Sequence, residues 1–279
     1  IHATKFNSNI HLVGLLSDGA VHSHIDHFKV VIDYFAKANF ANKIGFQPSP
    51  GQYQVICSDK RFRILIAGAR YGKSMVGGFD PAFYTHIFSD FRVWLVGPTY
   101  DLAEKEFNWI TEFISRYPMP NGGLLIDHCQ ISSPTRGKRR ILFEWGSFIE
   151  TRSTENMKSL LGEELDMIVL CEASCIPREA WERYLRARIG PRKGMLLATS
   201  TGAGDTNLFA EFVKKGLTET KEFRQWKTWQ FTTLDNPVFD HEEYEQARKE
   251  LAPEVFSEQY EGKLVSRRGL VFRFQNAHI

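Results

Sequence analysis

The stretch Ile64-Leu65-Ile66-Ala67-Gly68-Ala69-Arg70-Tyr71-Gly72-Lys73-Ser74 organises this chain. An apolar, β-branched run enters a glycine-rich turn that ends in Gly-Lys-Ser, the pattern of a strand followed by a phosphate-binding loop. Small residues are needed in such a turn because backbone N–H groups close around phosphate oxygens. Ala67 stands where the usual pattern has its first glycine. The stretch therefore predicts a nucleotide site.

Each part of the loop has an expected role. Lys73 would reach the β- and γ-phosphates of ATP, and the Ser74 hydroxyl would face Mg²⁺. The helix that begins near Lys73 would add its positive N-terminal end. The alternative is a glycine turn that contains Lys-Ser by chance. The residues expected to bind the nucleotide here are Gly68, Ala69, Arg70, Tyr71, Gly72, Lys73, Ser74 and Met75.

A carboxylate follows a second apolar run, which spans Asp166 to Ser174. The strand ends at Glu172, and a parallel sheet would bring that carboxylate beside the loop. Glu172 is then placed to act as general base on the attacking water, although a buried strand can end in glutamate by chance. Cys171 stands where a metal-holding aspartate is usual, and a neutral thiol is a poor ligand for Mg²⁺. Mg²⁺ would then depend on Ser74, the phosphates and water.

Two further side chains are candidates for contact with the nucleotide. Gln52, just upstream of the loop, can read adenine because its amide both donates and accepts hydrogen bonds. Gln54 is the alternative, and a surface glutamine explains the position nearly as well. Thr199 lies near the end of a third buried strand, where a hydroxyl can sense the γ-phosphate, but an ordinary Thr/Ser/Gly turn is equally common.

Strand and helix patterns alternate from the loop onward, which predicts an α/β fold with a mainly parallel sheet flanked by helices. Residues 124–153 break this alternation, since two apolar runs around Gly146-Ser147, within 141–151, predict a hairpin and hence an antiparallel extension. Further on, the pattern predicts a strand over 223–233, helices within 241–262 and a last strand over 264–274.

Composition places the chain among ordinary globular proteins, with 279 residues, 43% of them hydrophobic and 24% charged. A net charge of +2 gives no global field that would attract nucleic acid, so such a contact needs a local patch. The four cysteines have no repeated spacing that would indicate a disulfide framework or a zinc site. No apolar run approaches a membrane span, so no membrane partner is expected, and a reducing cytoplasm fits.

The motifs occur in an order that resembles the ATPase domain of a viral large terminase, the DNA-packaging motor of tailed phages. The resemblance covers about four-fifths of the chain, and an arginine inside the phosphate-binding loop is one of its more specific features. The stretches that carry it are Phe46 to Gln52, Ala67 to Ser74, Val96 to Tyr100, Val169 to Ser174, Ala198 to Thr201, Phe256 to Gly262 and Gly269 to Phe272.

This resemblance implies a P-loop NTPase of the ASCE type that uses ATP and Mg²⁺ to move double-stranded DNA into a capsid. Glu172, Arg70 and Lys73 would be catalytic, with Arg70 on the γ-phosphate of its own subunit. The family also uses an arginine from a neighbouring subunit, for which Arg139, Arg140 and Arg152 are open alternatives. Implied partners are a portal protein and a small terminase subunit. The chain would form a homo-oligomeric ring when assembled and be a monomer alone, in the host cytoplasm at the procapsid portal.

The first residues have a different character. His11 to His27 resembles a segment of cofactor-independent phosphoglycerate mutase, with Ala20 in place of a glycine and His22 matching a substrate-contacting histidine. We expect a strand over 10–16, a helix over 21–38 and no mutase activity. The expected division is an appended βα segment, 1–43, and a P-loop ATPase domain, 44–279, without the nuclease domain that follows in terminases.

Three alternatives remain open at this point. A helicase-like nucleic-acid ATPase would share the chemistry, but no second helicase domain with its own arginine motif follows. A nucleotide-binding module with little turnover would result if Cys171 cripples metal binding. A mutase fragment is the third and weakest alternative.

Overall fold

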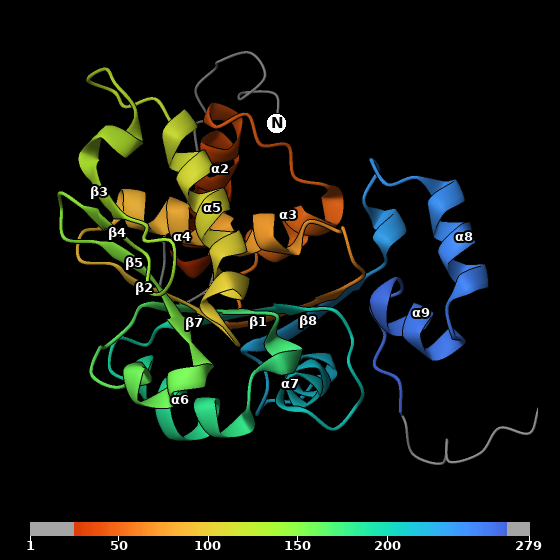
Figure 1. Ribbon diagram of the computed structural model, residues 1–279. Helices are drawn as coiled ribbons and strands as arrows, with labels where there is room; N and C mark the ends of the chain where they lie inside the picture. The colour runs from red at the N-terminus through yellow and green to blue at the C-terminus, as the bar shows by residue number, and fades with distance from the viewer. Residues whose placement is uncertain (1–24, 267–279) are drawn as a thin grey trace, which may run out of the picture.

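A computed structural model describes residues 25–266 of the chain, with side chains from residue 31 onward. The described residues form one sheet with helices on both faces (Figure 1). Its strands are β1 Phe62–Ala67, β2 Arg92–Gly97, β3 Cys129–Ser132, β4 Arg140–Phe143, β5 Phe148–Ser153, β6 Met167–Cys171, β7 Met195–Ser200 and β8 Trp226–Phe231. Its helices are α2 Ile25–Lys43, α3 Pro50–Ile56, α4 Lys73–Ile87, α5 Tyr100–Arg116, α6 Arg186–Arg188, α7 Leu208–Leu217, α8 His241–Glu250 and α9 Pro253–Gln259.

The sheet has the strand order β3-β4-β5-β2-β6-β7-β1-β8. All neighbours from β5 to β8 pair in parallel, whereas β4 pairs antiparallel with both β5 and β3. The expected mainly parallel sheet with an antiparallel extension at 141–151 is therefore confirmed. Parallel pairing brings the C-terminal ends of β1, β6 and β7 to one edge, where ligands of such sheets bind.

Two apolar layers enclose the sheet. One layer packs α2, α3, α4 and α5 against one face, with Phe40, Val55, Phe79 and Phe107 among its buried residues. The other layer packs α7 and the π-helical turn Ala180–Leu185 against the opposite face. Both faces are covered, which explains why the central strands are almost continuously apolar instead of alternating.

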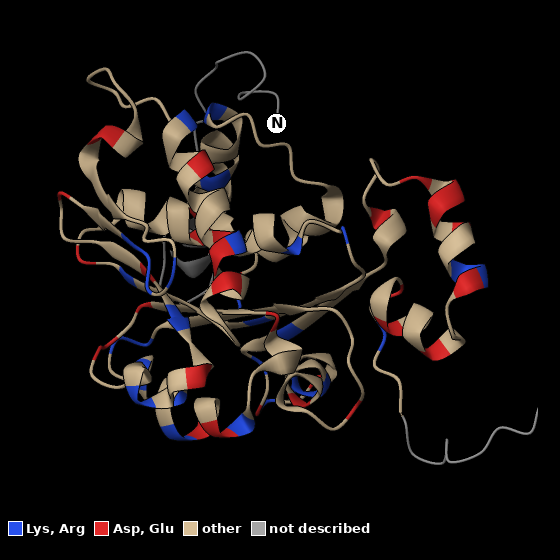
Figure 2. Cartoon of the chain, viewed as in Figure 1, with Lys and Arg blue, Asp and Glu red and all other residues tan. Residues whose placement is uncertain are grey.

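The last two helices form a separate small cluster at the β8 end of the sheet (Figure 1). Tyr244 of α8 packs edge-on against Phe256 of α9, with ring centroids 5.0 Å apart. Acidic residues lie along both of these helices, and Arg248 and Lys249 lie in the last turn of α8 (Figure 2). None of the described helices has the length and apolar character needed to cross a membrane.

The N-terminal helix differs from its prediction because α2 ends at Lys43 instead of residue 38. Its last turns enter the core, where the Phe40 ring stacks on Tyr117 at 4.9 Å and meets Phe79 and Phe83 edge-on. Residues just before the expected division at residue 43 therefore pack into the same core as residues after it. The division itself stays a prediction. The strand expected over 10–16 lies outside the described residues, as does most of the one over 264–274, whose residues 264–266 are not in a strand.

Candidate nucleotide site

The loop between β1 and α4 needs glycine at two positions. Gly72 has φ +97, and a Cβ there would lie 2.5 Å from Nε2 of Gln52. Gly68 has no unusual φ, but a Cβ there would lie 2.3 Å from the carbonyl oxygen of Tyr260 and 2.4 Å from Oγ1 of Thr233. Gly72 permits a left-handed turn, and Gly68 permits the close approach of Thr233 and Tyr260.

Residues between 233 and 260 hold the loop by hydrogen bonds to the backbone of Ala69 and Arg70. The Ala69 N–H donates to the Gln259 carbonyl at 2.6 Å, and the Thr233 hydroxyl donates to the Ala69 carbonyl at 2.8 Å. The Asn236 amide donates to the Arg70 carbonyl at 2.7 Å. Arg70 has φ 63 and an exposed side chain, so the loop presents this guanidinium outward. Local sequence patterns missed these contacts because they join residues 164 and 166 positions apart.

Lys73 begins α4 and turns back across the loop. Its Nζ donates to the carbonyl oxygens of Ala67 at 3.0 Å and Gly68 at 2.9 Å. Burial lowers the pKa of Lys73 to about 8, with Glu172 opposing that change and Lys105 adding to it. The partly buried Lys73 ammonium is held by two carbonyl dipoles and forms no ion pair among the described residues, so a bound anion would stabilise it.

Glu172 follows β6 directly, as the sequence indicates. It has φ 50, an uncommon conformation for a residue other than glycine, asparagine or aspartate. Its carboxylate accepts from the Ser200 hydroxyl at 3.5 Å and lies 3.8 Å from Nζ of Lys105. Both contacts are long and the side chain is 30% exposed, so water can reach the carboxylate.

These groups border one cleft of about 680 Å³. Its lining residues come from the loop, α4, α5, the ends of β6 and β7, and α9. They are Ala69, Arg70, Gly72, Lys73, Ser74, Met75, Lys105, Trp109, Glu172, Thr201 and Gln259. A second cleft of about 490 Å³ shares Arg70, Gly72, Met75 and Trp109 with the first and continues to Phe46 and Val238. A polar cleft and a more aromatic cleft therefore meet at the loop.

The Gln52 amide is largely engaged within the protein. Its Oε1 accepts from the Ser49 N–H at 2.9 Å in a capping box at the start of α3. Its Nε2 donates to the Tyr71 carbonyl at 3.3 Å. Tyr71 itself is buried and stacks on Phe231 at 4.9 Å, so its ring faces the core and only its backbone faces the loop. One N–H and one lone pair of Gln52 remain for a base.

Thr199 and Gln54, the other side chains considered for contact with the nucleotide, do not line either cleft beside the loop. Thr199 is 2% exposed and is paired in register with Cys171 and Leu65. It borders neither cleft, whereas Thr201, two residues on, borders the polar one. Gln54 lies on another cavity, away from the loop. The roles of Gln52 and Thr199 in binding stay predictions.

Glu106, a buried carboxylate in α5, was not predicted from the sequence. Its side chain reaches the Cys171 thiol and the Ser74 hydroxyl, and burial raises its pKa to about 7. It is 3% exposed, and its Oε2 has no hydrogen-bond partner between residues 31 and 266. A signal was present, because Glu106 falls on the same helical stripe as the apolar residues Ala103 and Phe107.

The donors that could hold Mg²⁺ are few. The Ser74 hydroxyl is available at the cleft, but Cys171 is fully buried and burial keeps the pKa of its thiol well above the ordinary value. No three His, Cys, Asp or Glu residues between 25 and 266 converge as a ready-made metal site. Oxygen donors from Ser74 and a nearby carboxylate suit Mg²⁺ only if nucleotide phosphates complete the set.

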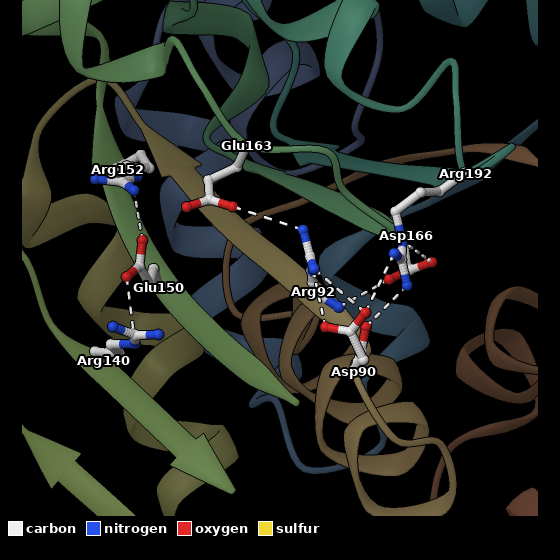
Figure 3. A network of polar contacts seen from close by, with 8 residues as sticks. All are labelled: Asp90, Arg92, Arg140, Glu150, Arg152, Glu163, Asp166 and Arg192. Atoms are coloured by element: carbon white, nitrogen blue, oxygen red, sulfur yellow. Dashed lines mark hydrogen bonds and ion pairs between the residues drawn. The ribbon is translucent and has the colours of Figure 1, made fainter. Parts of the chain in front are cut away.

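Arg139, Arg140 and Arg152, the candidates for action on a neighbouring subunit, each form an ion pair within their own chain. Arg152 and Arg140 flank Glu150 at 2.5 and 3.4 Å, as Figure 3 shows, and Arg139 lies 2.7 Å from Glu104. Figure 3 also shows a second network at the starts of β2 and β6, where Arg192 bonds Asp166 at 2.9 Å. None of the three arginines borders the polar cleft.

Comparison with known proteins identifies two parts of the chain. A family model described as the N-terminus of BPG-independent phosphoglycerate mutase matches residues 1–45. The mutase of aster yellows witches'-broom phytoplasma is 56% identical over 41 residues, which is 15% of this chain and 8% of that enzyme. Large terminase subunits match the longer part. That of Thermus phage G20c is 27% identical over 188 residues, and that of Escherichia phage T5 is 26% identical over 239 residues.

The T5 match covers 84% of this chain and 51% of that subunit, and the G20c match covers 63% and 38%, so the chain corresponds to about half of these relatives or less. Among solved structures, the large terminase ATPase domain of Thermus phage P74-26 superposes with a TM-score of 0.70 at 21% identity, covering 81% of this chain and 97% of that one. The large terminase of another thermophilic bacteriophage, in complex with ADP, gives 0.62 at 15% identity, covering 78% and 53%. The expected α/β fold, with a mainly parallel sheet and an antiparallel extension, is thereby confirmed as the fold of the terminase ATPase domain, and the chain joins a mutase-like N-terminal segment to a region similar to phage large terminases.

Proposed function

We propose that this chain is the motor ATPase of a large terminase, which hydrolyses ATP to drive double-stranded DNA into a capsid. The observation that carries the proposal is the meeting of Lys73, Glu172 and Arg70 at one polar cleft, on a loop that matches the phosphate-binding pattern. Structural neighbours support the choice of nucleotide, since one thermophilic phage terminase was crystallised with ADP and with ATP-γ-S.

Each residue has a role that follows from its position. Lys73 would exchange its two carbonyl partners for β- and γ-phosphate oxygens, and the loop N–H groups would bind the same phosphates. The Glu172 carboxylate would orient a water molecule and accept its proton as the water attacks the γ-phosphorus. The exposed Arg70 guanidinium would stabilise the charge on the γ-phosphate oxygens. Mg²⁺, bound through Ser74, would neutralise charge on the phosphates.

The base would occupy the adjoining, more aromatic cleft. That cleft contains Phe46 and Trp109 beside the free N–H of Gln52. A purine needs an apolar slot with a few fixed polar groups, which this cleft offers. Thr199 would act indirectly, since it lies between β6 and β1 and is followed by Thr201 at the polar cleft.

The wider assembly is also part of the proposal. The partners would be a portal protein and a small terminase subunit, with the chain monomeric alone and in a homo-oligomeric ring on DNA, in the host cytoplasm at the procapsid portal. A neighbour's site would be completed by Arg139, Arg140 or Arg152 only after that arginine leaves its acidic partner. We retain the division into 1–43 and 44–279, although Phe40 shows that a cut at 43 would remove core packing.

The test is Mg²⁺-dependent phosphate release by the purified chain, together with ATP titration of Lys73→Ala. We expect ATP to bind the wild type and binding to fall at least about a hundredfold in the variant, because charge-assisted hydrogen bonds to phosphate are lost. Unchanged affinity in Lys73→Ala would remove the assignment of the loop. Tight binding without phosphate release at any protein concentration would favour the nucleotide-binding module.

A further inference from the structure

The strand that ends beside the loop lacks the carboxylate that the chemistry needs. Cys171 ends β6, is fully buried and carries a neutral thiol. A protonated thiol binds Mg²⁺ poorly, because this small hard cation prefers oxygen ligands. The carboxylate at the next position, Glu172, faces Lys105 and Ser200 in the cleft. The Mg²⁺ site proposed at Ser74 therefore has no carboxylate from β6 itself.

A carboxylate reaches the same place from a different element. Glu106 extends from α5 toward the Cys171 thiol and the Ser74 hydroxyl. It is 3% exposed, yet its Oε2 has no hydrogen-bond partner in the part of the chain that the structure describes. Buried carboxylate oxygens are costly when unpaired, so a position that keeps one beside Ser74 indicates a ligand that completes it.

The neighbouring helix is shaped to admit this side chain. A Cβ on Gly77 would lie 2.8 Å from Cγ of Glu106 and 3.5 Å from its Oε1. A Cβ on Gly78 would lie 3.1 Å from the Glu106 carbonyl oxygen and 3.0 Å from Cβ of Trp109. Glycine is less favourable than alanine inside a helix, and here two consecutive glycines permit α5 to approach α4 with its glutamate between them.

We propose that Glu106 supplies the carboxylate of the divalent-cation site, in the place where β6 carries Cys171, and that it holds Mg²⁺ together with Ser74 and the nucleotide phosphates. This inference rests on the proposed ATP site, since one hydroxyl and one carboxylate bind Mg²⁺ usefully only with phosphate oxygens. Glu172 is left free for water, and the charge that Glu106 brings offsets that of the cation.

The experiment measures metal binding directly. Mn²⁺ replaces Mg²⁺ as an EPR-visible probe and is titrated into protein saturated with ADP, and ADP affinity is measured separately in EDTA. Glu106→Gln should weaken Mn²⁺ binding at least about tenfold, the lower range for loss of a group that supports a metal site. Its ADP affinity in EDTA should not fall. Adding Cys171→Asp to Glu106→Gln should restore most of the Mn²⁺ affinity.

Asp101→Asn makes the same change from carboxylate to amide at an exposed position in the first turn of α5 and should leave Mn²⁺ binding unchanged. Wild-type Mn²⁺ affinity in Glu106→Gln would overturn the inference while leaving the ATP site intact. Absence of ADP binding by the wild type in EDTA would overturn the proposed function and this inference with it. Glu106→Asp, which retains the charge but withdraws it by one methylene, serves if the glutamine variant does not fold, and wild-type Mn²⁺ affinity in it would also overturn the inference.

Discussion

Two lysines differ in what surrounds their charge: Lys37, which is buried in α2, and Lys73, which is partly buried at the start of α4. Lys37 of α2 donates to the Ile56 carbonyl at 2.8 Å and pairs with Asp33 at 3.1 Å and Asp80 at 3.5 Å. Burial alone would lower its pKa, but the two carboxylates more than reverse this, so the pKa of Lys37 lies above its ordinary value. Lys73 has carbonyl partners alone, and burial lowers its pKa to about 8.

The difference separates structure from function. A buried charge that the fold neutralises stabilises one arrangement and needs nothing more, as at Lys37, where Asp80 also pairs with Arg63 at 2.5 Å. A buried charge that the fold leaves without a counter-ion costs free energy until a ligand supplies one, as at Lys73. Among the described residues, Lys73 and Glu106 are ionisable groups of the candidate site that form no ion pair, and Oε2 of Glu106 also has no hydrogen-bond partner.

The largest expected effect is on catalysis at the uncompensated site. Glu172→Gln retains the shape of the side chain but removes its basicity, so single-turnover hydrolysis should fall by about 10²–10⁴ while ATP still binds. The melting temperature should change little, because the carboxylate is partly exposed and its contacts are long. Normal turnover in Glu172→Gln would end the assignment of Glu172 as general base.

The opposite pattern is expected at the compensated site. Asp80→Asn leaves Arg63 and Lys37 buried without their shared carboxylate, which should reduce the free energy of unfolding by about 3–5 kcal/mol. Urea denaturation measures this loss, and ATP affinity of the folded fraction should be unchanged. Asp33→Asn is the matched control, because Asp33 is partly exposed and such pairs contribute about 1 kcal/mol or less. Equal losses in the two variants would contradict the comparison.

Sequence reasoning predicted the part of the site that is local. The loop residues from Gly68 to Ser74 form one turn, and their pattern is sufficient to identify it. Glu172 was found because a parallel sheet aligns strand ends at one edge. Glu106 was not predicted because the residues beside it, Ser74 of α4 and Cys171 of β6, are distant in the sequence, and only folding brings those elements together.

The packing of α2 into the main core was not predicted from the sequence for a related reason. The resemblance of the first residues to a mutase suggested a separate segment, but packing depends on shape and polarity rather than ancestry. Phe40 and Lys37 find aromatic and acidic neighbours on α4, so these residues belong to the same core as Phe46. The resemblance concerns the sequence of the segment, and the contacts show which core its last residues join.

The smallest expected effect concerns His86, a titrating side chain near Phe40 that has no acidic partner among the described residues. The His86 ring packs at a tilt against Tyr117 and Phe40, with centroids 4.4 and 6.0 Å apart, and its buried Nδ1 has no hydrogen-bond partner among the described residues. Burial lowers the pKa of His86, and the nearby Lys43 lowers it further. Between that lowered pKa and the ordinary value of 6.5 the unfolded chain binds more protons than the folded one. The free energy of unfolding therefore rises with pH through this window and is lost as pH falls.

His86→Phe retains the ring contacts and removes the titration, so its stability should depend less on pH below 6.5 than that of the wild type. Urea midpoints at several pH values on either side of 6.5 measure the difference, which should be smaller than the effect of Asp80→Asn because His86 is only partly buried. His241→Gln, at an exposed position that begins α8, should leave the wild-type pH dependence intact. Parallel pH curves for His86→Phe and the wild type would show that Lys37 and its neighbours hold no uncompensated group, and the contrast with the nucleotide site would then be complete.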